Sequence, residues 1–198
     1  MSGRLEIILR LYSKDKSKRL KTYIAFTPLT KLSKEITMQS DKLSGTCACN
    51  QVIYELDDSG MYCQACHCLD CQRISGSSFI VNIWIEANRV HLLEGNTQQV
   101  IISAGRDQHT LTMCAHCNSC IWSRYHAAPG NTLFVKSGTL NPECQVAPRA
   151  HIFTRSKQDW MLLDETLPSF DSFYDMKKLW PAESLKRYRI NIQESASI

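Results

Sequence analysis

The sequence predicts a mainly β protein built from antiparallel sheets. Short runs rich in β-branched and aromatic residues recur through the middle of the chain, several of them with alternating apolar and polar residues. No long helical pattern separates these runs in the sequence, and strands spaced this closely usually pair as antiparallel neighbours. The hydrophobic content of 43% and the charged content of 21% are typical of a globular protein.

The expected elements follow one another in this order. The first strand covers 51–56 and ends at the turn cluster Asp57-Asp58-Ser59-Gly60. Six further strands are expected at 79–85, 90–94, 99–103, 109–113, 120–125 and 132–137, separated by glycine or proline residues. The pattern then changes. A helix is expected over 170–180, where Pro181 stops it, and a second short helix over 182–188.

The charge distribution predicts three regions: a basic and flexible N-terminal arm (1–42), a folded domain (43–168) and a partly helical C-terminal extension (169–198). Residues 1–44 contain ten Lys and Arg against four Asp and Glu, whereas residues 45–198 contain thirteen against fifteen. A nucleic-acid-binding face normally places its basic residues on the folded domain. Nucleic acid is therefore not an expected partner, and the arm is expected to be solvated.

The N-terminal residues do not resemble a secretory signal. The apolar stretch Leu5–Leu11 is interrupted by Glu6 and Arg10, and no small-residue cleavage site follows it. A mitochondrial presequence fits a little better, because the segment is basic, but the acidic residues Glu6 and Asp15 count against it. No run of eighteen apolar residues occurs, so no membrane-spanning helix is expected. We expect a cytoplasmic protein, with the nucleus as an alternative. In such a reducing compartment, clustered cysteines are more often metal ligands than disulfide partners.

The cysteines form three clusters and one isolated residue. The clusters are Cys47-x-Cys49, Cys63-x-x-Cys66-His67-Cys68-x-x-Cys71 and Cys114-x-x-Cys117-x-x-Cys120, and the isolated residue is Cys144. Because zinc prefers four tetrahedral ligands, three such clusters predict bound zinc. Two partitions remain open. In one, the first and third clusters form a four-sulfur site and leave Cys66, Cys68 and Cys71 as a three-sulfur site. In the other, Cys63 joins these three and closes their site.

Several motifs resemble the glutathione-dependent formaldehyde-activating enzyme family, which includes the centromere-protein-V-like proteins. The similar segments are Gly45-Thr-Cys47-Ala-Cys49-Asn-Gln-Val52, Cys66-His-Cys68-Leu-Asp-Cys71-Gln-Arg73-Ile-Ser75-Gly76, Met113-Cys114-Ala-His-Cys117, Ser137-Gly138-Thr139-Leu140-Asn141-Pro142, His151-Ile, Trp160 and Leu163-Asp164-Glu-Thr-Leu167-Pro168. They occur in the family's order and cover about 43–168.

The resemblance implies a compact antiparallel fold, the β-tent, with two zinc ions per chain. By resemblance, Cys47, Cys49, Cys114 and Cys117 bind a structural zinc, and Cys66, Cys68 and Cys71 bind a catalytic zinc with an open position for a thiol. The implied activity is a carbon–sulfur lyase that joins glutathione, or a similar small thiol, to formaldehyde or a related aldehyde. The alternative is a non-catalytic zinc module that contacts chromatin or another acidic partner through its basic arm. A redox or metal-buffer protein is a third option.

The sequence departs from the family pattern at four positions, one of which is the additional cysteine Cys120. Gln72 replaces the usual first arginine, so Arg73 is the remaining candidate for pairing with a glutathione carboxylate. The alternative role for Arg73 is an ordinary surface ion pair. Asn118 replaces a glycine, and asparagine tolerates the left-handed backbone that such a turn needs. Cys63 is additional and, if it closed the second zinc site, would exclude catalysis. The oligomeric state is left open by the sequence.

Overall fold

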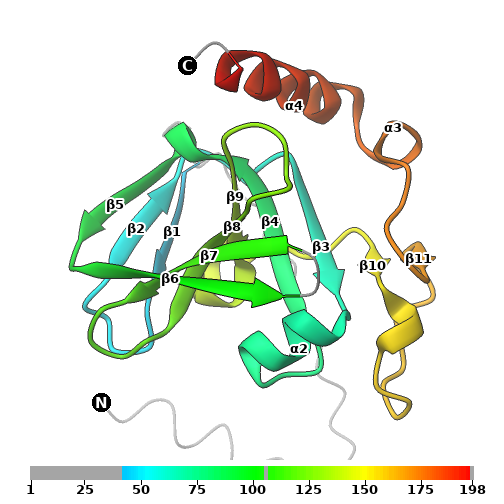
Figure 1. Ribbon diagram of the computed structural model, residues 1–198, viewed down its shortest axis with the longest axis horizontal. Coiled ribbons are helices and arrows are strands. Elements are labelled where there is room, and N and C mark those ends of the chain that lie inside the picture. The colour runs from blue at the N-terminus through cyan, green and yellow to red at the C-terminus, as the bar shows by residue number, and fades with distance from the viewer. Residues whose placement is uncertain (1–41, 105–106, 197–198) are drawn as a thin grey trace, which may run out of the picture. The chain divides into compact units, whose positions relative to one another are not determined.

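The protein consists of eleven strands in two sheets within the residues that the computed structural model describes, 42–104 and 107–196 (Figure 1). The smaller sheet has the order β1-β2-β5, formed by Leu43–Thr46, Ile53–Leu56 and Val90–Glu94. The larger sheet has the order β11-β10-β3-β4-β9-β8-β7-β6. Its strands are β3 (Tyr62–Cys66), β4 (Ile80–Glu86), β6 (Thr97–Ala104), β7 (Asp107–Cys114), β8 (Cys120–Tyr125), β9 (Thr132–Lys136), β10 (His151–Ile152) and β11 (Ser169–Phe170).

Helices are few and short in the described residues. They are α2 (Leu69–Ser75), α3 (Met176–Leu179), α4 (Ala182–Ser195) and the 3₁₀ turns η2 (Ala87–Arg89), η3 (Ser137–Thr139), η4 (Pro142–Cys144) and η5 (Thr154–Ser156). The predicted fold class, mainly β with a short C-terminal helical extension, is confirmed.

The predicted strands correspond to β2, β4, β5, β6, β7, β8 and β9, with ends that shift by a few residues. The strands β1, β3, β10 and β11 were not expected. Most pairs are antiparallel, but β10 lies parallel to both β3 and β11.

The C-terminal helices also differ from the expectation. The predicted helix over 170–180 is wrong in its first half, where β11 and a loop precede α3. The side chain of Asp175 caps α3 by accepting from the N–H of Lys177, so the helix cannot extend further back. The second helix, α4, begins at the expected residue and continues to Ser195.

The large sheet buries residues on both of its faces. One face packs against the small sheet in a core that includes Tyr54 and Leu56 from β2 and Ile83 from β4. The opposite face packs against the C-terminal segment through Trp84 and Tyr62. Trp180 stacks on Tyr62 with ring centroids 5.2 Å apart. Because side chains alternate along a strand, neighbouring residues of β3 and β4 enter different cores.

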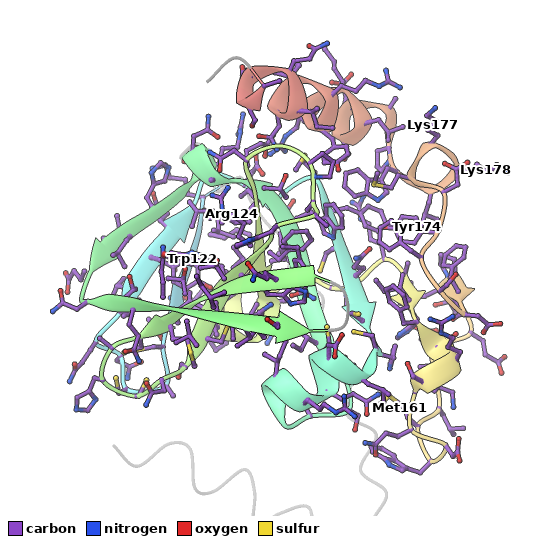
Figure 2. The ribbon with its side chains drawn as sticks, viewed as in Figure 1. Trp122, Arg124, Met161, Tyr174, Lys177 and Lys178 are labelled. Carbon is purple, nitrogen blue, oxygen red and sulfur yellow. The ribbon has the colours of Figure 1, made fainter. Side chains whose placement is uncertain are left out.

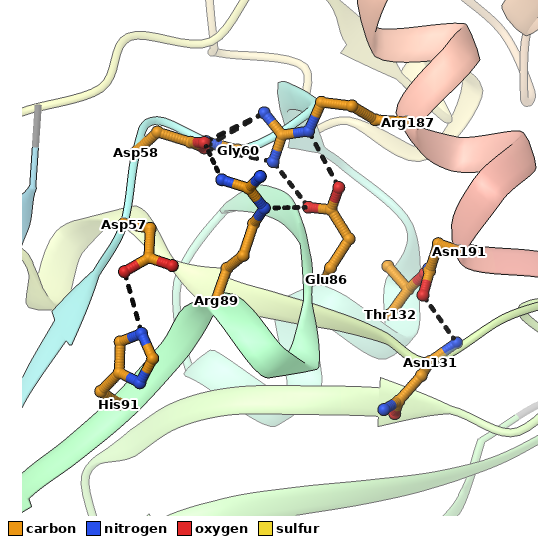
Figure 3. Close-up of polar contacts among 10 residues, drawn as sticks. All are labelled: Asp57, Asp58, Gly60, Glu86, Arg89, His91, Asn131, Thr132, Arg187 and Asn191. Atoms are coloured by element: carbon orange, nitrogen blue, oxygen red, sulfur yellow. Dashed lines mark hydrogen bonds and ion pairs between the residues drawn. The ribbon is translucent and has the colours of Figure 1, made fainter. Parts of the chain in front are cut away.

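Helix α4 is held to the sheet by a charged cluster (Figure 3). Arg187 donates to Glu86 at 2.9 and 2.6 Å and to Asp58 at 3.2 Å. Asn191, one turn further along α4, donates to the hydroxyl of Thr132 at 2.8 Å. These contacts tie the C-terminal segment to β4 and β9, at the end of the sheet where β4 terminates.

The N-terminal arm lies outside the described residues, so the division into 1–42, 43–168 and 169–198 stays a prediction. Among the helices of the described part, none is long and apolar enough to cross a membrane. The cellular compartment also stays a prediction.

Candidate metal centres and an adjoining pocket

Four cysteines from two distant turns come together in the structure. Cys47 and Cys49 lie in the turn after β1, and Cys114 and Cys117 lie at the end of β7 and in the turn that follows. Their four sulfur atoms are all within 4.8 Å of one another. Both turns contain an asparagine with positive φ, at Asn50 and Asn118. The φ of 59° at Asn118 confirms the expectation that asparagine accepts the left-handed turn there.

The four-cysteine group fits a zinc ion. A tetrahedral site with Zn–S bonds of about 2.3 Å places its sulfur atoms about 3.8 Å apart. The sulfur of Cys49 lies 3.4 Å from that of Cys47 and 3.8 Å from that of Cys114. The N–H of Val52 donates to the sulfur of Cys47 at 3.2 Å. Hydrogen bonds from Ser119 lower the pKa of Cys117 to about 5. Both features favour the thiolate forms that zinc requires.

Three further cysteines form a second group. Cys66 and Cys71 of this group belong to the core on the opposite face of the large sheet from the four-cysteine group. Cys66 ends β3, Cys68 is the N-cap of α2, and Cys71 lies in the first turn of that helix. Their sulfur atoms are also within 4.8 Å of one another, and those of Cys66 and Cys68 are 3.4 Å apart. This contact raises the pKa of Cys66 and lowers that of Cys68 to about 2. The N–H of Cys71 donates to the Cys68 sulfur at 3.4 Å, so this group also fits a metal ion.

The structure brings Cys63 into neither group. Cys63 and Cys66 are three residues apart on β3, so their side chains leave opposite faces of the strand. Cys63 packs in the core between the sheets, whereas Cys66 belongs to the core on the far face. Its sulfur lies 3.7 Å from the carbonyl oxygen of Val146. Burial raises the pKa of Cys63 to about 12, which is typical of a packed thiol. Cys120 and Cys144 also stay outside both groups.

A pocket of about 590 Å³ opens beside the three-cysteine group. Cys66 and Cys68 line it, and none of the four cysteines in the other group does. Aromatic side chains form much of the remaining wall: Trp84, Tyr125, Phe134, Phe153 and Phe173. The Tyr125 hydroxyl lies 3.9 Å from the sulfur of Cys71. The three-cysteine group is therefore the one that a small molecule can reach through a cavity.

Polar residues of the pocket come from several elements. Arg73 of α2, predicted from the sequence, lines the pocket together with Asp70 and with Arg155 of η5. Gln64 and Asn82 line it from β3 and β4. Sequence reasoning missed Gln64, Asn82, Tyr125 and Arg155, because their elements meet only through the sheet order. Period-two alternation in 80–86 would have placed Asn82 on the same face as Trp84, but not beside a cysteine cluster.

The residues around the metal loop have structural partners. Gln72 donates to the carbonyl oxygens of His67 and Ser156 at 2.8 and 2.7 Å, which joins α2 to η5. The ring of His67 lies away from the pocket, 3.0 Å from the ring nitrogen of His151 and against Phe79. Burial lowers the pKa of His67 to about 4, so the ring is neutral at physiological pH.

Comparisons with known proteins agree with the motifs. The family model described as "Glutathione-dependent formaldehyde-activating enzyme" matches residues 42–156, which is more than half of the chain. Among solved structures, a crystal structure of a Rhodobacter sphaeroides protein is similar at 20% sequence identity with a TM-score of 0.40, covering 54% of this chain and 93% of that chain. The comparison with curated proteins finds no match.

Proposed function

The chain belongs to the glutathione-dependent formaldehyde-activating enzyme family, and from this we propose that it is a zinc-dependent carbon–sulfur lyase. The substrates are glutathione, or a similar small thiol, and formaldehyde or a related aldehyde, and the product is the S-hydroxymethyl adduct. One observation carries the proposal. Cys66 and Cys68 of the three-cysteine group line a pocket, and the extra cysteine nearest to this group in sequence, Cys63, faces the opposite core.

The two cysteine groups take different roles in this proposal. Cys47, Cys49, Cys114 and Cys117 hold a structural zinc, because four thiols complete its tetrahedron and leave no position for a substrate. Cys66, Cys68 and Cys71 hold the catalytic zinc. Bound there, the metal supplies one piece of chemistry, the deprotonation of an incoming thiol at neutral pH. Two zinc ions per chain are expected.

The pocket residues bind and orient the organic substrates. Arg73 and Arg155 are solvent-exposed and line the same pocket, where they offer two cationic partners for the carboxylates of glutathione. The aromatic wall formed by Trp84, Phe134 and Phe173 excludes water from the reacting atoms.

Zinc-edge X-ray absorption with a glutathione titration tests the proposal. Averaged over two sites, the spectrum should change from seven sulfur neighbours for two zinc ions to eight when glutathione is added. The Cys66→Ser variant should lose one zinc and the glutathione response together. Eight sulfurs before glutathione is added would contradict an open site and would favour the non-catalytic zinc module. Formation of the adduct faster than in protein-free buffer, followed by NMR, measures the activity itself.

A further inference from the structure

Two buried amide side chains lie next to each other in the floor of the pocket. Gln64 of β3 is directly opposite Asn82 of β4 in the antiparallel register, so their side chains share one face of the sheet. Each is 3% exposed, and both line the pocket together with Cys66. An amide has a donor end and an acceptor end, so its chemical effect on a bound molecule depends on which end faces the cavity.

The orientation of Gln64 is determined by a relay from the C-terminal extension. The indole N–H of Trp180 donates to the Tyr174 hydroxyl at 2.8 Å. An indole is only a donor, so the hydroxyl accepts this bond and uses its own hydrogen for the Gln64 oxygen at 2.5 Å. The carbonyl end of Gln64 is therefore occupied. Tyr174 reaches the sheet from the segment between β11 and α3 (Figure 2).

The orientation of Asn82 is determined by a buried lysine. The Lys136 ammonium donates to the Asn82 oxygen at 2.8 Å and to the Ser123 hydroxyl at 2.9 Å. An ammonium group has no acceptor, so only the oxygen of Asn82 can face it. Burial lowers the pKa of Lys136, and the nearby sulfurs of Cys120 and Cys71 act in the opposite direction.

These contacts use only the side-chain oxygens of Gln64 and Asn82, so both amide nitrogens remain without a bond from them. Among the described residues, neither the nitrogen of Gln64 nor that of Asn82 has a hydrogen-bond acceptor. A third donor also lacks a partner in the described part of the chain, the indole N–H of Trp84, which lines the pocket at 7% exposure. Unlike the indole N–H, the two amide nitrogens are not fully buried atoms. Donors without protein acceptors at the wall of a cavity favour a ligand that supplies an oxygen.

We propose that the side-chain N–H groups of Gln64 and Asn82 bind the oxygen of the carbonyl substrate and stabilise the alkoxide that it becomes. This inference rests on the proposed function. In the forward reaction the thiolate sulfur forms a bond to the carbonyl carbon, the C=O π electrons move onto the oxygen, and that oxygen takes a proton from water. Negative charge develops on the oxygen during this step, where preorganised donors are most effective. Tyr174 and Lys136 are positioning residues.

The decisive variant is Asn82→Asp. The carboxylate keeps the volume and still accepts from Lys136, but its donor is lost. We expect kcat to fall about 100- to 1,000-fold, the usual effect of removing one such donor, with the KM for glutathione within about threefold of wild type. The matched control is Asn141→Asp. The amide of Asn141 donates to the Ser44 hydroxyl at 2.8 Å, and neither residue lines the pocket or belongs to α4. This variant should lower the melting temperature and leave kcat unchanged.

A second pair of variants guards against misfolding of the first. Tyr174→Phe removes one hydroxyl and frees Gln64 to turn its oxygen toward the cavity, which should lower kcat by about tenfold, less than the loss of a whole donor. Tyr188→Phe is its control, because Tyr188 is a buried tyrosine on α4 that packs on Trp84 and Trp180. Wild-type kcat in Asn82→Asp and Tyr174→Phe, or equal losses in the two controls, would overturn the inference.

A binding measurement separates this inference from the proposed function. Sodium formate carries a carbonyl-like oxyanion and needs no glutathione. In NMR spectra of the zinc-loaded protein, formate should shift the side-chain NH₂ signals of Gln64 and Asn82, whereas sodium chloride should not. Asn82→Asp should weaken formate binding at least tenfold. If wild type forms no thiol–aldehyde adduct, the proposed function falls and the formate titration decides alone. Shifts at both amides then support the donor pair, and unshifted signals refute it.

Discussion

Replacing one cysteine in each metal group should have opposite consequences, and the comparison of Cys114→Ser with Cys66→Ser tests the two roles. The four-cysteine group joins the turn after β1 to the turn after β7, and these strands belong to different sheets. A direct hydrogen bond also joins these turns, from the N–H of Ala48 to the Ser119 hydroxyl at 3.2 Å. A metal bound by the four cysteines would add a second and stronger link between these turns.

The two losses differ in size for a structural reason. Binding of a structural zinc contributes about 10–16 kcal/mol in small zinc domains, which matches or exceeds the roughly 5–15 kcal/mol stability of a whole domain. Cys114→Ser should therefore unfold the domain at 37 °C. The ligands of the other group lie within six consecutive residues, and this segment has its own backbone tie to β10, a hydrogen bond from the N–H of His67 to the Ile152 carbonyl oxygen at 2.9 Å. The cost of Cys66→Ser is then about 1–3 kcal/mol, or roughly 2–12 °C in melting temperature.

The assay combines zinc per chain, from inductively coupled plasma mass spectrometry, with thermal unfolding followed by circular dichroism. Cys66→Ser should contain one zinc and remain folded, whereas Cys114→Ser should lack the cooperative transition. Cys144→Ser is the control, because Cys144 belongs to neither group and should keep two zinc ions. A folded Cys114→Ser protein beside an unfolded Cys66→Ser protein would reverse the roles and refute this reasoning.

Three further outcomes are expected. Burial raises the pKa of both Cys63 and Tyr54 to about 12, from ordinary values of 9.0 and 10.0, so their neutral forms stabilise the fold below pH 9 and this contribution is lost as pH rises toward 12. The melting temperature should fall between pH 8 and pH 11, and it should fall less steeply in Cys63→Ala than in wild type. Equal slopes in the two proteins would contradict a raised pKa of the Cys63 thiol. Iodoacetamide at pH 8 should label Cys63 only after denaturation in guanidinium, and mass spectrometry of the native protein shows whether it is protected. Arg187→Ala should cost about 1–3 kcal/mol in urea unfolding, because the Glu86 carboxylate that it pairs with is only 11% exposed, whereas Arg189→Ala on the exposed face of α4 should change stability by less than about 0.5 kcal/mol.

The strand pattern could be predicted where each strand alternates or is rich in β-branched residues. All seven expected strands occur, since β4, β8 and β9 are apolar enough to be recognised locally. Strand β3 was missed because all five of its residues are buried, including a glutamine. From its sequence neighbours alone, Gln64 would be predicted to lie on the surface. The group that donates to its side-chain oxygen is the hydroxyl of Tyr174, 110 residues further along the chain. Local sequence cannot predict burial that depends on so distant a partner.

The candidate site was predictable in its cysteines and not in its cavity. Spacing predicted the clusters, and the resemblance divided seven of the cysteines as the structure groups them. Spacing alone did not decide whether Cys63 belongs to the three-cysteine group. The alternation of side chains decides this only when residues 62–66 are known to form a strand. Once β3 is known, an odd separation of three residues places Cys63 and Cys66 on opposite faces. The secondary structure, more than the spacing, thus excludes Cys63 from the three-cysteine group.

The C-terminal extension has a closer relation to the pocket than its position in the chain suggests. The family match ends at residue 156, yet Phe173 lines the pocket and Tyr174 bonds Gln64 in its floor. These two residues stay in place because Trp180 donates to Tyr174 and because Arg187 anchors α4 to Glu86 and Asp58. Weakening the anchor should therefore act on catalysis as well as on stability. We expect Arg187→Ala, assayed well below its melting temperature, to reduce kcat in the same direction as Tyr174→Phe, because both changes release the carbonyl end of Gln64. If kcat stays at the wild-type value while the melting temperature falls, α4 stabilises the domain without orienting the site.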